Sequence, residues 1–447
     1  MQKPVILFFA RGYQADFFPA LRSDRYRAVF VTLTADERRR VESQQAPVAA
    51  CFEESFDDLP EAHIDDGYLV SSFAADRFLG RFNFAMRRKI LGKEIAFWQQ
   101  LFDEHRPVAV VNELVAIEIS EVLLAECRRR NVRYLAGMNC VVDDLFYWLP
   151  NPLSLSGEHL PKLVPDARAR DLAAAYLADV QATDYKPFYV RNLAARRDLK
   201  PLAASLAKLG LWFWRRWTDT LLRRFRYESY VDEYSKKIVV YFKSLMIRYD
   251  TLDALPAQAE VIFYPLHQEP EATLNYMSEF CSNQVATIEN ILKCMTPDQI
   301  LVVKEHPVDK GALLRRKFQQ LKSEQSALYF LPAELHGREV LRYASRVVTL
   351  TSTVGWEAAI VGKPVYVMGK IFYDNAVGVG RADNFGELRA FLRSPPSSSG
   401  AGVEQFAGFV ANMVAACHPG NPFPHPSLYG AVNRARIVAA ICDAAGI

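Results

Sequence analysis

The sequence has few of the features that mark disulfide-bonded, membrane-spanning or nucleic-acid-binding proteins. Its 447 residues include only seven cysteines, an odd number, which are scattered and never form a C-x-x-C pair. We therefore expect free thiols in a reducing compartment. No stretch approaches the ~18 consecutive apolar residues of a membrane span. The net charge of +3 argues against a protein dedicated to nucleic acid. These absences predict a cytoplasmic protein, soluble or peripheral to the inner membrane.

Metal-binding and nucleotide-binding signatures are also scarce. The eight histidines form no H-x-x-x-H pair and do not cluster with cysteine, so metal ligation is not expected. There is no P-loop, and no D-x-D triplet of the kind that binds a metal diphosphate. By contrast, 50% of the residues are apolar and 23% are charged, which excludes a disordered or fibrous chain. The length suits two domains or one large domain.

Short apolar runs alternate with helical patterns in the first and last parts of the chain. The runs, typical of strands buried on both faces, are residues 5–10, 28–33, 108–111, 261–266, 300–304, 328–331, 347–351 and 364–368. Helical spacing fills the gaps, for example over residues 84–102 and 117–130, and returns at 431–445. This alternation predicts an α/β fold with two Rossmann-like domains facing a cleft. The domains we predict are residues 1–250 with a helical insertion, 251–425, and a closing helix within 426–447.

The helical insertion contains a basic aromatic segment, residues 211–226. It begins Leu-Trp-Phe-Trp-Arg-Arg-Trp and continues with Arg223, Arg224 and Arg226. Mixed aromatic and cationic side chains suit a membrane surface rich in anionic lipid, so the segment predicts peripheral membrane contact. A helix packed between domains with a solvated basic edge explains the same pattern equally well.

Polar turns follow three predicted strands of the second half. They begin at His267, Glu305 and Ser352. Ligands collect at the carboxyl ends of strands in open parallel sheets, so we expect these turns to converge on one crevice.

The turn at Ser352 is hydroxyl-rich and precedes a helix. Ser352 or Thr353 would cap that helix, whose amino end attracts an anion such as a phosphate. Glu357 lies four residues beyond Thr353 and would reach ribose hydroxyls from the same face. An ordinary N-cap with a surface glutamate is the alternative for this segment alone. Lys304 and His306 add the positive charge that favours an anion site.

Several motifs together resemble a known family. They are His267-Gln-Glu-Pro270, Lys304-Glu-His-Pro307, Thr351-Ser-Thr-Val-Gly-Trp-Glu-Ala358, Gly362-Lys-Pro-Val365 and Phe372-Tyr-Asp374. The set resembles the capsule polysaccharide biosynthesis glycosyltransferases, and within them it is most similar to the retaining β-Kdo transferases. The resemblance is specific over residues 261–374. It implies the GT-B architecture and transfer of Kdo from CMP-Kdo to a bacterial surface glycan, such as O-antigen or capsule, without metal or cofactor.

The resemblance also implies a donor-binding site. Its expected residues are His267, Gln268, Lys304, His306, Pro307, Thr351, Ser352, Thr353, Gly355 and Glu357. Ser352 and Thr353 would hold the phosphate, the backbone of His306 and Pro307 would border the cytosine, and Glu357 would bind ribose. A CMP-sugar leaves as a monophosphate, so Lys304, His306 and the helix end would stabilise the leaving group without a metal.

Retention of configuration needs two inversions or a front-face route, and the resemblance to the β-Kdo transferases implies two displacements with a carboxylate nucleophile. We predict Asp232 as the nucleophile and Glu158 as a second carboxylate that transfers a proton at the acceptor or at the leaving oxygen. A helix start and a solvated loop residue are the structural alternatives, and Glu113 and Asp144 are the reserves. Two other functions stay open: another CMP-sugar transferase, such as an inverting sialyltransferase-like enzyme, or a catalytically silent glycan-binding module. The expected partners are the donor and an oligosaccharide acceptor.

Overall fold

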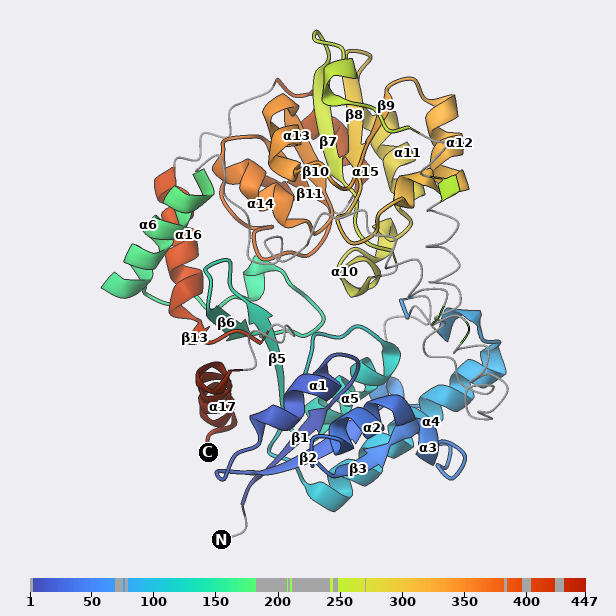
Figure 1. Ribbon diagram of the computed structural model, residues 1–447, viewed down its shortest axis with the longest axis vertical. Helices are drawn as coiled ribbons and strands as arrows, with labels where there is room; N and C mark the ends of the chain where they lie inside the picture. The colour runs from blue at the N-terminus through green and yellow to red at the C-terminus, as the bar shows by residue number, and fades with distance from the viewer. Residues whose placement is uncertain are drawn as a thin grey trace. The chain divides into compact units, whose positions relative to one another are not determined.

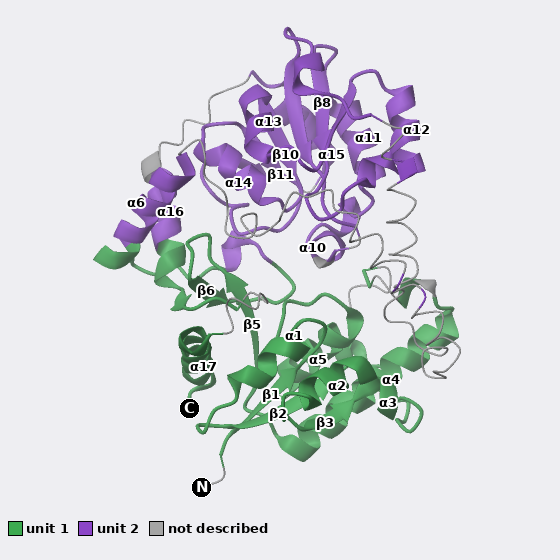
Figure 2. Cartoon of the chain, in the orientation of Figure 1, with its two compact units in different colours: residues 1–154, 160–169, 412–447 green, residues 155–159, 170–411 purple. Residues whose placement is uncertain are grey.

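The computed structural model divides the chain into two compact units (Figures 1 and 2). Unit 1 contains residues 1–154, 160–169 and 412–447, and unit 2 contains residues 155–159 and 170–411. The structure describes residues 3–68, 75–76, 79–181, 207, 210, 242–243, 248–269, 271–381, 384–395, 403–422 and 430–447. The predicted second domain, 251–425, thus ends earlier in the structure, because the chain from residue 412 onward packs with unit 1.

Unit 1 is an α/β unit built on one sheet. Its strands are β1 (Val5–Phe9), β2 (Arg27–Thr32), β3 (Val48–Cys51), β4 (Ala109–Asn112), β5 (Arg133–Asn139), β6 (Leu145–Trp148) and β13 (His418–Pro419). Its helices are α1 (Gln14–Phe17), α2 (Ala35–Glu42), α3 (Phe52–Ser55), α4 (Phe84–His105), α5 (Glu118–Arg129) and α17 (Ala431–Ala445). The sheet order is β13-β6-β5-β4-β1-β2-β3.

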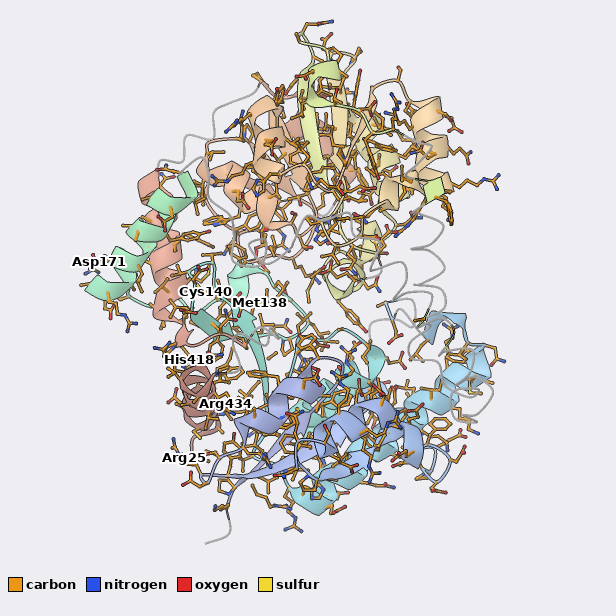
Figure 3. The ribbon with its side chains drawn as sticks, in the orientation of Figure 1. Arg25, Met138, Cys140, Asp171, His418 and Arg434 are labelled. Atoms are coloured by element: carbon orange, nitrogen blue, oxygen red, sulfur yellow. The ribbon has the colours of Figure 1, made fainter. Side chains whose placement is uncertain are left out.

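The middle of this sheet is parallel and one edge is antiparallel. Strand β1 is fully buried and pairs in parallel with β2 and β4, as an all-apolar central strand should. Strand β6 runs antiparallel to both of its neighbours, so Met138 of β5 and His418 of β13 lie on either side of it (Figure 3). The C-terminal segment thereby completes the sheet that the N-terminus begins.

Helix α17 closes the core of unit 1. Its buried residues Ile437 and Ile441 join a cluster that includes Phe8 and Phe30 of the central strands. The predicted helix at 431–445 agrees with the observed limits of α17. Apolar residues at helical spacing in the last segment therefore supply part of the core of the first unit.

Unit 2 contains a second sheet, and all of its pairs are parallel. Its strands are β7 (Glu260–Pro265), β8 (Gln299–Lys304), β9 (Leu328–Leu331), β10 (Arg346–Thr349), β11 (Val365–Val367) and β12 (Val379–Arg381), in the order β12-β11-β10-β7-β8-β9. Its helices are α10 (Ala272–Asn275), α11 (Gln284–Cys294), α12 (Arg316–Glu324), α13 (Gly337–Tyr343), α14 (Thr353–Ile360) and α15 (Phe385–Arg393). Helices α6 (Ala167–Gln181) and α16 (Val403–Ala415) are divided between the units.

The predicted fold class, α/β with two Rossmann-like halves, is confirmed by these two sheets. The order of unit 2 reverses beside β7: the chain runs from β7 to β8 and β9 on one side, then to β10, β11 and β12 on the other. Such a reversal leaves the loops after the two central strands free to form a ligand site at their carboxyl ends. These loops begin at Leu266 and Leu350.

All seven cysteines are free thiols, as predicted. Within the described parts of the chain, no helix is both long and apolar enough to cross a bilayer. The basic aromatic segment 211–226 lies outside the described residues, so its membrane contact stays a prediction.

Candidate functional site

The loops after β7 and β10 meet at the carboxyl edge of the unit 2 sheet. The backbone N–H of Thr351 donates to Nε2 of His267 over 3.1 Å. Both side chains are buried. Burial, together with the nearby His306 imidazole, lowers the pKa of His267 to about 3, so the ring is neutral. Because Nε2 accepts a hydrogen bond, the ring proton belongs on Nδ1. His267 thus joins two of the predicted turns through one bond.

A glutamine that the motifs did not reveal fixes the His267 loop. Gln284, fully buried at the start of α11, accepts a bond from the N–H of His267 (2.7 Å) and donates to its carbonyl (2.9 Å). Its amide also donates to Glu269 (3.0 Å). Gln268, between these residues, is half-buried. The loop is therefore held by its backbone, which leaves the role of Gln268 at the donor a prediction.

Lys304 and His306 lie at the end of β8 beside His267. The amine of Lys304 is buried and donates to the carbonyls of Glu305 (2.9 Å) and Ala333 (3.3 Å). Burial lowers the pKa of Lys304 to about 8. Burial and the Lys304 charge lower the pKa of His306 to about 4. An imidazole with that pKa is neutral at pH 7, so the positive charge expected on His306 is not present in the free protein.

The loop that continues from His306 is held by a buried carboxylate. Glu305 accepts bonds from the N–H groups of Gly311 (2.8 Å) and Leu313 (2.9 Å) and from the hydroxyl of Tyr249 (2.8 Å). These bonds close the turn that carries His306 and Pro307, both half-buried. These bonds hold the His306 and Pro307 backbone at the carboxyl edge of the sheet, and its contact with a base stays a prediction.

Helix α14 begins at the hydroxyl-rich turn. Ser352 is its N-cap, and its hydroxyl accepts a bond from the N–H of Val354 (3.3 Å), so the predicted cap is confirmed. Ser352 and Thr353 are half-buried at the amino end of the helix. The hydroxyl of Tyr373 donates to the carbonyl of Ser352. This end of α14 has the exposure and polarity that an anion site needs, and phosphate binding there stays a prediction.

Gly355 is packed too closely to tolerate a side chain. A Cβ at this position would overlap the hydroxyl of Tyr373 and lie 2.8 Å from Cγ2 of Thr349. We expect Gly355→Ala to lower the free energy of unfolding by about 1–3 kcal/mol, because the cap or Tyr373 must shift. Urea unfolding of the variant measures this. Gly408→Ala in α16, where a Cβ meets no atom within 4 Å, is the control, and equal losses would contradict the packing role.

Glu357 is already paired with another side chain, although the sequence predicted a carboxylate available to ribose hydroxyls. Its carboxylate is buried and accepts a bond from Nε of Arg338 over 3.1 Å. Arg338 comes from the first turn of α13 and also donates to the carbonyl of Val180. Burial raises the pKa of Glu357, and Arg338 opposes that rise. The expected role at the ribose is therefore coupled to an arginine that no motif revealed.

Glu158 lies in a short segment that unit 2 holds tightly. The hydroxyl of Ser156 and the N–H of Gly157 donate to Oδ1 of Asp374 over 3.0 and 3.1 Å. The Glu158 carboxylate is 59% exposed and pairs with Arg381 over 3.1 Å. The segment is thus anchored while the predicted catalytic group faces solvent. The Phe372-Tyr-Asp374 motif serves as the anchor.

The remaining catalytic candidates lie elsewhere. Asp232 is outside the described residues, so its role as nucleophile stays a prediction. Glu113, a reserve at the end of β4 in unit 1, pairs with Arg11 and accepts a bond from the hydroxyl of Tyr13 (3.1 Å). Asp144, the other reserve, occupies the left-handed region with φ of 59° in a turn before β6. Its role as a reserve catalytic residue stays a prediction.

The comparisons with known proteins found a family whose model matches part of this chain. Residues 223–404 match the capsule polysaccharide biosynthesis protein family. The resemblance seen in the motifs over residues 261–374 is thereby confirmed. The match includes every turn of the carboxyl edge described above.

A curated relative is similar to a short part of this chain. The capsule polysaccharide export protein KpsS of Escherichia coli is 39% identical over 80 residues, which cover 17% of this chain and 21% of the relative. The aligned part therefore spans about a fifth of the curated relative's length.

Solved structures with similar arrangements include two transferases and an epimerase. The β-Kdo 2,7 and 2,4 transferases of Thermosulfurimonas dismutans KpsC are 12% identical, with coverage of 77% and 75% of this chain and 88% and 87% of theirs. Their TM-scores are 0.33 and 0.34. A UDP-GlcNAc 2-epimerase of Methanocaldococcus jannaschii is 10% identical, with coverage of 91% and 97% and a TM-score of 0.31.

Proposed function

We propose that this protein is a retaining β-Kdo transferase, which moves Kdo from CMP-Kdo to a bacterial surface glycan without a metal ion. The family match over residues 223–404 carries the proposal. It is supported by the position of the motifs, since His267, Thr351 and the capped end of α14 occupy adjacent loops at the carboxyl edge of one parallel sheet.

The donor's nucleotide would bind at this edge. The amino end of α14 would take the phosphate, and the rigid backbone at His306 and Pro307 would border the base. Glu357, paired with Arg338, would accept bonds from ribose hydroxyls. A bound phosphate would raise the pKa of His306 from about 4 and draw a proton onto the ring. A monophosphate leaving group would then be stabilised by neutral donors and an induced charge.

The chemistry would follow two displacements. A carboxylate, predicted to be Asp232, attacks the anomeric carbon, and the bond to the phosphate oxygen breaks as CMP leaves with the electron pair. An acceptor hydroxyl then attacks the same carbon, and the bond to the enzyme carboxylate breaks. The second carboxylate, Glu158, takes the proton of the attacking hydroxyl.

Intact-mass analysis with CMP-Kdo tests the donor, the nucleophile and the two-step route together. We expect Asp232→Cys to gain the mass of one Kdo residue, because a sulfur-linked sugar resists the second displacement. The unsubstituted protein should release CMP without a lasting gain, and Asp232→Asn should lose turnover by at least about 100-fold. Asp253→Cys, at an exposed position, is the control. Normal turnover by Asp232→Asn would remove this residue from the mechanism.

Donor competition separates the remaining alternatives. Release of CMP from CMP-Kdo and not from CMP-sialic acid supports the proposal, and the reverse supports a sialyltransferase-like enzyme. If no donor releases CMP while an oligosaccharide still binds, the glycan-binding module is the better description.

A further inference from the structure

Glu158 lies in a five-residue segment that belongs to unit 2. Residues 155–159 belong to unit 2, although residues 1–154 and 160–169 on both sides of them belong to unit 1. The segment contains one turn of 3-10 helix, Gly157–His159. Five residues have little surface with which to remain attached, so specific bonds must hold them.

Asp374 supplies those bonds. Its side chain is fully buried, and its Oδ1 atom accepts from both the hydroxyl of Ser156 and the N–H of Gly157. The N–H of Gly157 is also 3.3 Å from the carbonyl of Ile371. A Cβ at Gly157 would overlap the carbonyl of Phe372. The backbone is therefore pressed directly against the 371–375 turn, which fixes the origin of the Glu158 side chain.

Arg381 orients the carboxylate itself. It lies at the end of the edge strand β12, and its NH1 atom is 3.1 Å from Oε1 of Glu158 and 3.5 Å from Oδ2 of Asp374. One guanidinium thus bridges the buried anchor and the exposed carboxylate. Such a charge-assisted contact limits the rotamers of Glu158.

From this geometry we propose that Asp374 and Arg381 are positioning residues that hold Glu158 as the proton acceptor for the attacking hydroxyl. Glu158 then acts in the second displacement, in which that hydroxyl loses its proton. The proton passes from the attacking oxygen to a Glu158 oxygen as the new bond forms and the bond to the enzyme carboxylate breaks. This inference rests on the proposed function.

The test separates the two displacements. With CMP-Kdo alone, water is the acceptor: the first CMP released reports the first displacement, and steady release of free Kdo reports the second. We expect Arg381→Gln to keep the first release of CMP within about two-fold and to slow steady turnover by about 10- to 100-fold. Glu158→Gln should slow steady turnover by about 100-fold or more. Arg381→Lys, which keeps the charge, should recover part of the loss.

Recovery of turnover in the presence of azide distinguishes the loss of a catalytic base from a merely structural defect. Azide attacks the anomeric carbon without giving up a proton, so it needs no base. Sodium azide should restore turnover in Glu158→Gln and Arg381→Gln and should not accelerate Arg316→Gln, an exposed arginine at the start of α12. The product in the rescued reactions is the azide of Kdo.

Several outcomes would overturn the inference. One is a loss of the first CMP release and of steady turnover in equal measure, and another is Arg381→Gln behaving as Arg316→Gln does. Failure of azide to rescue either variant is a third. The absence of CMP release from the unsubstituted protein would instead reject the proposed function, and with it the base role. Hydrogen exchange at the Gly157 amide gives a separate measure of the anchor: Asp374→Asn should speed it by about 10-fold or more, and unchanged exchange would refute the anchoring.

Discussion

Replacement of Arg338 by glutamine is expected to lower the free energy of unfolding by about 3–5 kcal/mol at pH 8, because it leaves the Glu357 carboxylate buried and without its cation. Both side chains are nearly sealed from water, at 12% and 7% exposure. The loss should be smaller at pH 5. Burial already raises the pKa of Glu357, and without Arg338 it rises further, so the folded protein keeps a proton that the unfolded chain loses as the pH increases.

A double variant distinguishes a broken ion pair from general damage. Arg338→Gln with Glu357→Gln removes both charges and should recover more than half of the stability lost by the single change. Arg342→Gln, an exposed arginine on the same helix, is the matched control. Urea unfolding at pH 5 and pH 8 measures all four proteins. A loss in Arg338→Gln that is the same at both pH values would show that the arginine acts through packing.

The same variants connect the ion pair with the proposed nucleotide site. If Glu357 accepts bonds from ribose hydroxyls, its carboxylate must be correctly oriented, and the bond from Arg338 provides that orientation. Calorimetric titration with CMP should show binding about 10-fold weaker in Arg338→Gln, with little change in Arg342→Gln. The stability loss and the binding loss then have one physical origin.

Much of the fold follows from local sequence patterns. The run Leu328–Leu331 coincides with β9, and apolar spacing gives the limits of α17. Strands β7, β8 and β10 begin one residue before the predicted runs. Buried parallel strands are nearly all apolar, so they can be recognised without knowledge of their partners.

The elements that the patterns missed depend on distant partners. Strand β13 has two residues, His418 and Pro419, and exists as a strand because it pairs with β6. Strand β5 contains Arg133, Gly137 and Asn139, which interrupt any apolar run. Residues 412–447 belong to unit 1 because the apolar face of α17 packs into the core of that unit. Its packing partners lie far away in the sequence, so no short stretch of sequence reveals this contact.

The site residues also divide into those that local sequence predicts and those that depend on distant partners. The cap at Ser352 is a local device and was predicted. The bonds of His267 to Thr351 and of Glu158 to Arg381 join residues 84 and 223 positions apart, and only folding brings them together. Lys304 shows why residue type alone misleads. Its amine was expected to be free to bind an anion, and it instead donates to two backbone carbonyls. Sequence therefore located the edge of the sheet, and the partners define what each side chain can do there.

Replacement of Glu118 by glutamine is expected to stabilise the protein in alkaline solution. Glu118 begins α5 in unit 1, is 1% exposed, and has two carboxylate oxygens without a hydrogen-bond partner among the described residues. Burial raises its pKa to about 10, and the carboxylates of Glu94, Asp76 and Glu121 add to the rise while Arg87 opposes it. Glu118 is therefore protonated in the folded protein at neutral pH.

The sign of the pH dependence follows from this difference. The unfolded chain loses the Glu118 proton near pH 4.5, and the folded protein loses it near pH 10. The stability of the native protein is therefore fully present below the lower value and falls as the pH rises toward the upper one.

Glutamine has the shape of the protonated acid and does not titrate. We expect Glu118→Gln to match the native protein at pH 4 and to exceed it by about 1–3 kcal/mol at pH 9. Glu279→Gln, at an exposed position, should show no such divergence, and parallel unfolding curves for Glu118→Gln and the native protein from pH 4 to pH 9 would mean that Glu118 is ionised in the folded state.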